Sequence, residues 1–196
     1  MEKPGWRLRA SRYVVDSPYM RLRMDEVELP DGTIVPNYYV RESQGFVVIF
    51  PLTADERVVL VRQYRYGADS IHLELPAGML LDGEEPRACA LRELSEETGY
   101  DVERCELAAQ YYPEPVRSTA RAYVYIASGV RKVREPVPDV TEHLEVELAP
   151  LDDFRAMLVD GRIDTGATIA AGFLALQKLR SPLKPGPERG GTSEGP

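Results

Sequence analysis

The chain has 196 residues, of which 43% are hydrophobic, and this length suits one globular domain or one domain with a small extension. Its formal net charge of −8 argues against a nucleic-acid backbone or an anionic membrane as the main partner, because both are negatively charged. A small anionic substrate is compatible with this charge, since a bound divalent cation and a few arginines can reverse the local sign.

The start of the chain and its two cysteines bear on location. The sequence MEKPGWRLRAS contains no apolar signal core, and no apolar run approaches the roughly 20 residues of a membrane span. Cys89 and Cys105 are too few for a disulfide framework, and we expect both as buried, small apolar side chains in a reducing compartment. We therefore expect a cytoplasmic protein that binds neither membrane nor nucleic acid.

The N-terminal part of the chain predicts β-structure. Residues 1–10 are expected to form a loose arm, and residues 12–41 alternate short apolar segments with turns. Asp31-Gly32, placed between two such segments, is a strong hairpin signal. We predict an antiparallel β extension over residues 1–42, followed by a main domain over residues 43–180.

This extension has more apolar side chains than a small sheet can bury. They are Tyr13, Val14, Val15, Tyr19, Met20, Leu22, Val27, Leu29 and Ile34. A sheet of a few strands cannot cover both of its faces, and its edges favour pairing with another chain. Exchange between two copies in a homodimer would cover it and could carry arginine or tyrosine side chains to the partner's substrate pocket. The alternative is a sheet that packs on its own main domain.

The main domain alternates predicted strands and helices. Two short apolar runs, residues 46–50 and 58–61, are typical of strands covered on both faces. We predict further strands at residues 73–78, 106–112, 122–127 and 144–148, and helices at residues 87–97, 151–160 and 164–179. Residues 181–196 have the Pro, Gly and Ser content of a disordered tail.

The segment over residues 78–100, GMLLDGEEPRACALRELSEETGY, is the most informative in the chain. Pro86 suits a first helical turn, and Gly99 suits a helix terminus. On the helix between them, Ala88, Leu91 and Leu94 lie roughly opposite three glutamates. These are Glu93, Glu96 and Glu97, whose spacing puts them on one face. Because like charges on one face destabilise a helix, a cation is expected beside them.

Two interpretations of the three glutamates are open from their spacing alone. Charge runs most often form a solvated helix face. Carboxylates are also hard oxygen donors that suit Mg²⁺ or Mn²⁺, which share their coordination shell with water and substrate phosphates. The choice between them depends on the surrounding residues Gly78, Glu84, Arg92 and Gly99, which carry a resemblance to a known family.

The spacing and all eight fixed letters of this segment resemble the Nudix box, the signature of hydrolases that cut a nucleoside diphosphate linked to another group. Only Tyr100 departs, because it stands where the family usually has an aliphatic residue. The resemblance implies that Glu93, Glu96 and Glu97 bind the catalytic divalent cation, with the Ala77 carbonyl as a further ligand. It also implies that Glu84 and Arg92 pair to brace the loop against the helix, with Gly78 and Gly99 in structural roles.

The flanking residues resemble the ADP-ribose pyrophosphatase branch of that family. The resemblance rests on RQYR at residues 62–65, LELPAG at residues 73–78, and Pro115, which lies 16 residues beyond Gly99. It implies that Arg65 binds a substrate phosphate, unless Arg65 is only a surface ion-pair partner. The other substrate-binding candidates are Arg62, Pro115 and Tyr39, with Tyr38 and Tyr64 as further stacking candidates.

Downstream, DVTEHLEVE resembles the acidic loop of the branch, which supplies a glutamate for catalysis or a second metal shell. Glu142 is the first candidate by position and Glu145 the second. His72 and His143 are alternative general bases, although isolated histidines are more often structural or solvent-exposed.

We predict an α/β protein with the α/β/α sandwich and mixed sheet of the Nudix fold, plus the N-terminal β extension. The resemblance implies metal-dependent hydrolysis of a nucleoside diphosphate sugar, foremost ADP-ribose to AMP and ribose 5-phosphate. The enzymatic alternative is another nucleotide sugar such as GDP-mannose. A catalytically silent sensor is the alternative from another class, and the retention of every box glutamate argues against it.

Overall fold

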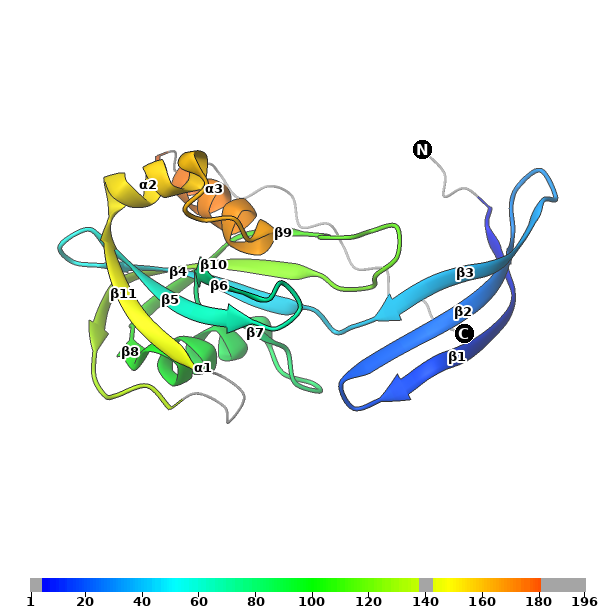
Figure 1. The fold of residues 1–196 in the computed structure, drawn as a ribbon, viewed down its shortest axis with the longest axis horizontal. Helices are drawn as coiled ribbons and strands as arrows, with labels where there is room; N and C mark the ends of the chain where they lie inside the picture. The colour runs from blue at the N-terminus through cyan, green and yellow to red at the C-terminus, as the bar shows by residue number, and fades with distance from the viewer. Residues whose placement is uncertain (1–4, 138–142, 181–196) are drawn as a thin grey trace.

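The computed structural model describes residues 5–137 and 143–180. An N-terminal sheet contains strands β1 (Arg7–Ser17), β2 (Met20–Glu28) and β3 (Ile34–Glu42), antiparallel in that order. This sheet projects from the rest of the molecule (Figure 1). The predicted hairpin signal is confirmed, since Asp31 and Gly32 lie between β2 and β3. The predicted disordered tail lies outside the described residues.

The prediction of a loose arm up to residue 10 was wrong. Strand β1 begins at Arg7, because residues 7 and 8 pair with Glu28 and Val27 of β2. Arg7 and Arg9 each donate a hydrogen bond of 2.6 Å to the same Glu28 carboxylate oxygen. The sequence RLRAS lacks the apolar alternation of a half-buried strand, and cross-strand ion pairs supply the pairing instead.

The central sheet has eight strands in the order β11-β5-β4-β10-β8, with β6 beside β5, β7 beside β4 and β9 beside β10. Strands β4 and β10 are parallel, and the other named strand pairs are antiparallel, so the sheet is mixed as predicted. The strands are β4 (Phe46–Thr53), β5 (Arg57–Arg65), β6 (Ser70–Glu74), β7 (Ala77–Met79), β8 (Tyr100–Asp101), β9 (Arg104–Tyr111), β10 (Ala122–Lys132) and β11 (Leu144–Pro150).

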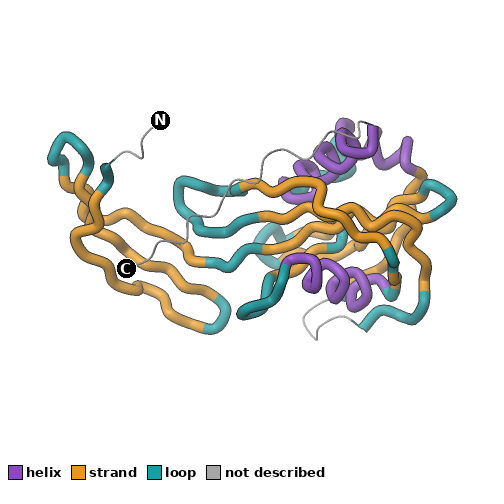
Figure 2. Tube along the Cα trace, turned by 180° about the vertical axis from the view of Figure 1, so that it is seen from behind, coloured by secondary structure: helices purple, strands orange, loops and turns teal. Residues whose placement is uncertain are grey.

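Helices cover both faces of this sheet, which confirms the predicted α/β/α sandwich. Helices α2 (Leu151–Asp160) and α3 (Gly166–Arg180) lie on one side, and α1 (Pro86–Thr98) lies on the other (Figures 1 and 2). The apolar run in β4 separates two cores. Val48 and Phe50 pack toward α2 and α3, whereas Val47 and Ile49 pack toward α1. All four side chains are fully buried, as the continuous apolar run predicts.

Helix α1 has the predicted limits within one residue at each end. Pro86 occupies its first turn, and Gly99 ends it in the left-handed conformation with φ 73°. The Gly99 amide donates to the Ser95 carbonyl at 3.0 Å. A Cβ atom at Gly99 would lie 2.1 Å from the Arg134 carbonyl oxygen, so only glycine fits there.

The buried face of α1 differs from the prediction. Ala88 is exposed, whereas Glu93 and Glu97 are buried together with Leu94. Leu91 and Leu94 pack into the core as predicted. The helix also contacts strand β7 through Glu93 and Glu97. This arrangement brings carboxylates into the interior beside the strand that leads into the helix.

A short junction joins the N-terminal sheet to the central sheet. The Thr119 hydroxyl accepts a hydrogen bond from the Ser43 amide at 2.8 Å and donates one to the Ser43 carbonyl at 3.0 Å. Gly45 has φ 108°, and a Cβ atom there would lie 2.3 Å from the Arg121 carbonyl. The Gly45 carbonyl accepts a hydrogen bond from the Leu80 amide at 3.1 Å. The junction therefore contacts both the β9–β10 connection and the loop before α1.

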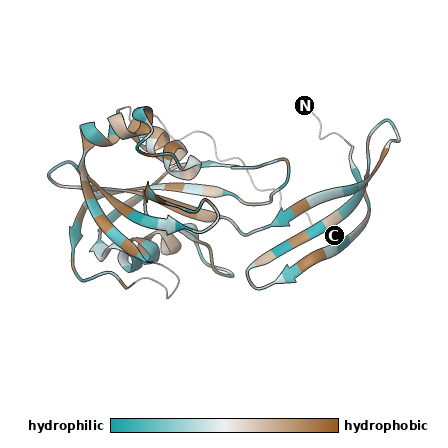
Figure 3. Ribbon diagram, in the orientation of Figure 1, coloured by the Kyte–Doolittle hydropathy of each residue, from teal (hydrophilic) through white to brown (hydrophobic). Residues whose placement is uncertain are grey.

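The N-terminal sheet exposes apolar side chains on a single chain. Strand β1 is exposed along nearly its whole length, and Figure 3 shows apolar residues distributed over the projecting strands. The large exposed apolar residues of this region are Trp6, Leu8, Tyr13, Val14, Val15, Tyr19, Met20, Ile34 and Tyr39. Within the described part of the chain, no helix is long and apolar enough to cross a membrane.

Candidate active site

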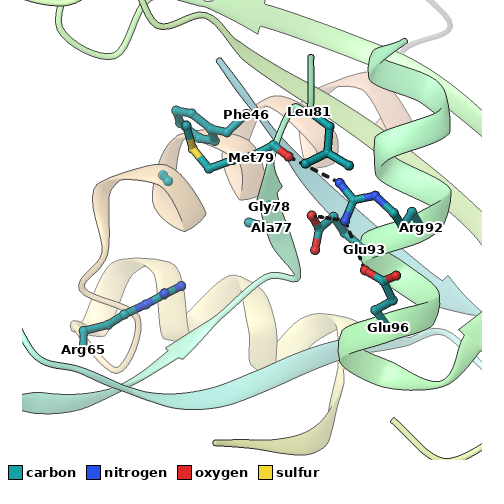
Figure 4. Close-up of a pocket in the computed structure, with 10 residues that line it drawn as sticks. Phe46, Arg65, Ala77, Gly78, Met79, Leu81, Arg92, Glu93 and Glu96 are labelled. Atoms are coloured by element: carbon teal, nitrogen blue, oxygen red, sulfur yellow. Dashed lines mark hydrogen bonds and ion pairs between the residues drawn. The ribbon is translucent and has the colours of Figure 1, made fainter. Parts of the chain in front are cut away.

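A cavity of about 430 Å³ opens where the ends of β4, β5 and β7 meet helices α1 and α3 (Figure 4). Its described lining residues are Phe46, Arg65, Ala77, Gly78, Met79, Leu81, Arg92, Glu93, Glu96 and Ala167. Cationic and anionic side chains therefore face one another across a space that also has an apolar wall. Such a combination of a concave site and a few converging polar groups is typical of a small-molecule site.

Strand β7 and helix α1 are in direct contact at this cavity. A Cβ atom at Gly78 would lie 1.9 Å from the Glu93 carboxylate, so the glycine allows that carboxylate to reach the strand. The Ala77 amide donates a hydrogen bond of 3.0 Å to Glu97. Glu93 is 9% exposed and Glu97 is 2% exposed. Two carboxylates are thus held almost out of water, an arrangement that requires compensating positive charge.

Arg92 and Glu84 form a forked ion pair between the loop and the helix. Arg92 Nε and Nη2 donate to the two Glu84 oxygens at 2.9 and 3.0 Å. Glu84 also accepts a hydrogen bond of 3.0 Å from the Leu81 amide. The hydrogen bond from Arg92 lowers the pKa of Glu84 to about 2, and the same contact raises the pKa of Arg92. This geometry ties the loop of residues 81–84 to α1.

Arg92 also reaches the proposed metal ligands. Its Nη1 donates to Glu93 at 2.7 Å and to Glu96 at 3.0 Å. Among the described residues, no group of three or more His, Cys, Asp or Glu side chains is arranged to hold a metal ion. The donor set itself suits a divalent cation, because carboxylate oxygens from one helix face border the cavity. Arg92 contacts only one oxygen of each carboxylate, Oε1 of Glu93 and Oε2 of Glu96, so the other oxygen of each could bind such a cation.

Arg65 lines the cavity, whereas Arg62 points elsewhere. Figure 4 shows the Arg65 side chain extending from β5 toward Ala77 and Gly78. Arg62 is paired with Glu147 of β11 and is absent from the described cavity lining. The two arginines lie three positions apart on β5, and successive side chains of a strand point to opposite faces. The structure therefore brings only one of them to the glutamates.

The other substrate-binding candidates lie away from the cavity of a single chain. Tyr39 is on β3 of the projecting sheet and is 43% exposed. Pro115 lies in the connection between β9 and β10, where the Tyr38 hydroxyl donates to the Val116 carbonyl. Tyr64 donates to Asp69 at 2.9 Å. None of them is among the described lining residues.

The histidines and the acidic-loop glutamates differ in how far the structure describes them. His72 Nδ1 lies 2.7 Å from Asp164, and its Nε2 lies 2.8 Å from the Ser70 hydroxyl. Both ring nitrogens thus have partners, which matches a structural histidine. Glu142 lies outside the described residues. Glu145 is exposed on β11, in register with Arg62.

Both cysteines are free and buried, as expected. Burial raises the pKa of Cys89 to about 12 and that of Cys105 to about 11. Arg92 Nη2, which belongs to a residue that lines the cavity, lies 3.4 Å from the Cys89 sulfur. A thiol with so high a pKa is a poor nucleophile at neutral pH, so neither cysteine is a candidate for covalent chemistry.

Several cavity residues were not found from the sequence. Phe46, Met79 and Leu81 form its apolar wall, and Ala167 reaches it from α3. Only Met79 and Leu81 lie within the box segment, and nothing in the sequence separated them from loop packing. Ala167 had no signal, because its position depends on how α3 crosses the sheet. Glu74 belongs to the LELPAG segment, but nothing in the sequence indicated that its carboxylate forms an ion pair with Arg65.

Comparison with known families agrees with this geometry. Residues 43–171 match the NUDIX domain family, and residues 6–40 match the nucleoside diphosphate sugar hydrolase N-terminal domain. The chain belongs to the Nudix hydrolase family and carries the N-terminal domain of its nucleoside diphosphate sugar hydrolases. Members of this family generally use divalent metal cations.

Curated relatives share sequence over most of their length. The chain is 34% identical over 161 residues to the methanol dehydrogenase activator of Bacillus methanolicus, covering 81% of this chain and 86% of the relative. It is 30% identical over 172 residues to the ADP-ribose pyrophosphatase of Bacillus subtilis, covering 86% and 92%. It is 38% identical over 156 residues to the GDP-mannose pyrophosphatase of Yersinia pestis, covering 74% and 77%.

A solved structure has the same fold. The crystal structure of an ADP compounds hydrolase superposes with a TM-score of 0.79 and 22% sequence identity. The match covers 92% of this chain and 96% of that structure. The match therefore includes most of the N-terminal sheet as well as the central sandwich.

Proposed function

We propose that this chain hydrolyses the diphosphate bond of ADP-ribose to give AMP and ribose 5-phosphate, with Mg²⁺ as cofactor, in the cytoplasm. The main support for this proposal is that Glu93, Glu96 and Arg65 line the same cavity. Glu97, on the same helix, accepts a hydrogen bond from the Ala77 amide. The carboxylates suit a cation that neutralises a diphosphate, and the arginine suits its phosphate oxygens. The relative of Bacillus subtilis, an ADP-ribose pyrophosphatase, supports this substrate.

Each residue has a distinct role in this proposal. Glu93, Glu96 and Glu97, with the Ala77 carbonyl, would hold the cation, which supplies charge neutralisation and a water of lowered pKa. Arg65 holds a phosphate oxygen and so orients the bond to be cut. Glu84 and Arg92 keep the loop and α1 in register. Glu142 is the first candidate for the assisting acidic-loop residue, and Glu145 is the second.

We further propose that the protein acts as a homodimer. The exposed apolar side chains of β1, β2 and β3 support this, because a second copy would cover them. The exchange would also account for the distance of Tyr39 and Pro115 from the cavity, since they could serve the site of the partner chain. A stacking tyrosine from the partner would then complete adenine recognition.

The deciding experiment is a substrate panel with Mg²⁺ that compares kcat/KM for ADP-ribose, GDP-mannose and other nucleotide sugars. We expect ADP-ribose to have the highest kcat/KM, with AMP and ribose 5-phosphate as products. Glu97→Gln serves as the control that separates this activity from a contaminant. A failure to cleave any nucleotide sugar would contradict the proposal.

GDP-mannose is the second candidate, because a GDP-mannose pyrophosphatase is 38% identical to this chain. The glutamates and Arg65 would serve either substrate, since both contain the same diphosphate. A higher kcat/KM for GDP-mannose in the same panel would replace ADP-ribose while leaving the proposed chemistry intact.

A further inference from the structure

Arg65 approaches the cavity with one edge of its guanidinium already engaged. Its Nε donates to Oε2 of Glu74 at 2.9 Å, and its Nη2 donates to the same oxygen. Glu74 is 8% exposed and belongs to β6, which pairs with β5. Within residues 5–137 and 143–180, the hydrogen bonds of the Arg65 guanidinium involve Nε and Nη2 and leave Nη1 without a partner. The carboxylate therefore fixes the direction of the guanidinium and leaves one end of it for a ligand.

The segment that carries Glu74 is also attached to helix α3 and to the residues just before that helix. His72 contacts Asp164, which precedes α3, at 2.7 Å. The Leu75 amide donates to the Thr168 hydroxyl within α3 at 3.2 Å. Helix α3 in turn supplies Ala167 to the cavity lining. Glu74 thus stands on a strand that is held by β5 and by contacts with α3 and Asp164, which allows it to hold Arg65 in one orientation.

We propose that Glu74 is a positioning residue that aims Arg65 at the substrate diphosphate. This inference rests on the proposed function, because it assumes that Arg65 meets a phosphate. A buried carboxylate next to a phosphate-binding arginine has two opposite effects. It can compete with the phosphate for the guanidinium, or it can orient the guanidinium so that its outer nitrogen meets the phosphate. The contact through Nε and Nη2 alone favours orientation, since Nη1 is left for the ligand.

Two conservative variants of Glu74 distinguish its effect on the orientation of Arg65 from the effect of its negative charge. Glu74→Gln keeps the length of the side chain and an oxygen that accepts hydrogen bonds, but it removes the negative charge. Glu74→Asp keeps the charge but withdraws it by one methylene. If Glu74 acts by orienting the Arg65 guanidinium, Glu74→Gln should keep kcat/KM for ADP-ribose within a few-fold of wild type. Glu74→Asp and Glu74→Ala should lose about 10- to 100-fold, the scale expected when a binding group is misplaced by about 1 Å.

A double-mutant cycle tests whether Glu74 acts through Arg65. Glu74→Ala should cause little further loss in an Arg65→Ala background, because there is no guanidinium left to aim. Glu147→Ala is the matched control, since it removes a carboxylate partner of another β5 arginine that lies off the cavity. Separate kcat and KM values, together with binding of a non-hydrolysable methylene analogue of ADP-ribose, distinguish poor phosphate contact from a general loss of structure.

The outcomes are distinct. A higher kcat/KM in Glu74→Ala would show competition and overturn the inference, as would equal or better activity in Glu74→Asp than in Glu74→Gln. Additive losses in the cycle would also overturn it. If Glu74→Ala does not fold, the Gln and Asp variants still decide the matter. Failure of wild type to cleave any nucleotide sugar would instead contradict the proposed function itself.

Discussion

Arg92 concentrates the largest set of polar contacts in the candidate site. Its guanidinium contacts Glu84, Glu93 and Glu96, and also donates to the Met79 carbonyl at 3.3 Å. The fork to Glu84 fixes the arginine, and the fixed arginine then restrains the two glutamates of its own helix. One side chain therefore couples the shape of the loop to the direction of the acidic groups.

The Glu84–Arg92 pair predicts a specific dependence of stability on pH. The folded pKa of Glu84 is about 2, below its ordinary value of 4.5. Its stabilisation is therefore fully present above about pH 4.5 and is lost as the pH falls toward 2. We expect Glu84→Gln to lower the free energy of unfolding by about 1 to 3 kcal/mol at pH 7, the scale of hydrogen bonds to charged groups.

Urea unfolding at pH 7, 4 and 3 measures this effect. The difference between wild type and Glu84→Gln should shrink as the pH falls through that window. Asp160→Asn is a suitable control, because the Asp160–Arg162 pair is exposed and should contribute little at any pH. A difference that stays constant from pH 7 to pH 3 would contradict the bracing role of Glu84.

Glu97→Gln should keep the fold and lose activity. The substitution preserves shape while removing a carboxylate that we propose as a metal ligand, so a loss of about 100-fold or more in kcat is expected. Wild type should also gain thermal stability on addition of Mg²⁺, because a ligand that binds only the folded state stabilises it. This gain should be smaller in Glu97→Gln. Activity within a few-fold of wild type at saturating Mg²⁺ would refute the assignment.

Arg65→Ala should lower kcat/KM for ADP-ribose by about one to two powers of ten, at roughly 1.4 kcal/mol for each power. Arg65→Lys should recover only part of this loss, since lysine lacks the planar fork that meets Glu74 and a phosphate together. Steady-state kinetics of both variants provide the measurement. Unchanged kcat/KM in Arg65→Ala would make Arg65 a surface ion-pair partner.

At the scale of elements, the sequence predicted best where one local signal dominates. Helix α2 has its predicted limits, and the apolar run of β4 predicted burial on both faces. Strand β8, with only two residues, was missed because it has no pattern of its own and depends on pairing with β10. Strand β1 was predicted too short, because ion pairs rather than apolar alternation hold its first residues.

The candidate site was predictable only in part for a similar reason. The box segment named its glutamates and Arg92 through their spacing, since one helix carries them. Arg65 was the first substrate-binding candidate and Arg62 a further one, and the sheet shows that Arg65 faces the cavity whereas Arg62 faces Glu147. Residues brought in by other elements, such as Phe46 and Ala167, depend on tertiary packing that no local pattern encodes.

Two helix-ending glycines provide a matched test of local packing. Gly99 and Gly161 both have positive φ, 73° and 85°, at the ends of α1 and α2. A Cβ atom at Gly161 would meet nothing within 4 Å, whereas one at Gly99 would lie 2.1 Å from backbone. Gly161→Ala should cost about 1 to 2 kcal/mol for the left-handed conformation alone. Gly99→Ala should cost about 3 kcal/mol or more.

Thermal and urea unfolding of the two variants measure the difference. Equal losses would mean that the contact with Arg134 relaxes freely and that only the backbone conformation matters. A larger loss in Gly99→Ala should be accompanied by lower activity, because the glycine ends the helix that carries the glutamates.

At the scale of the whole molecule, the projecting sheet predicts association. Nine large apolar residues of this region are exposed on a single chain, and a second copy is the partner that we propose for them. Sedimentation at micromolar concentration should give twice the mass of the chain. A mass near that of one chain would contradict the homodimer and would leave Tyr39 and Pro115 without a site to serve.

The junction between the two sheets has a consequence for how the site can be observed. The Leu80 amide, inside the loop before α1, donates to the Gly45 carbonyl, just beyond the last strand of the projecting sheet. Its hydrogen–deuterium exchange therefore reports on the attachment of that sheet as well as on the loop. If pairing with a second chain steadies the sheet, exchange at Leu80 should slow with protein concentration. A single amide in the loop before α1 would then report the binding of a second chain to the projecting sheet.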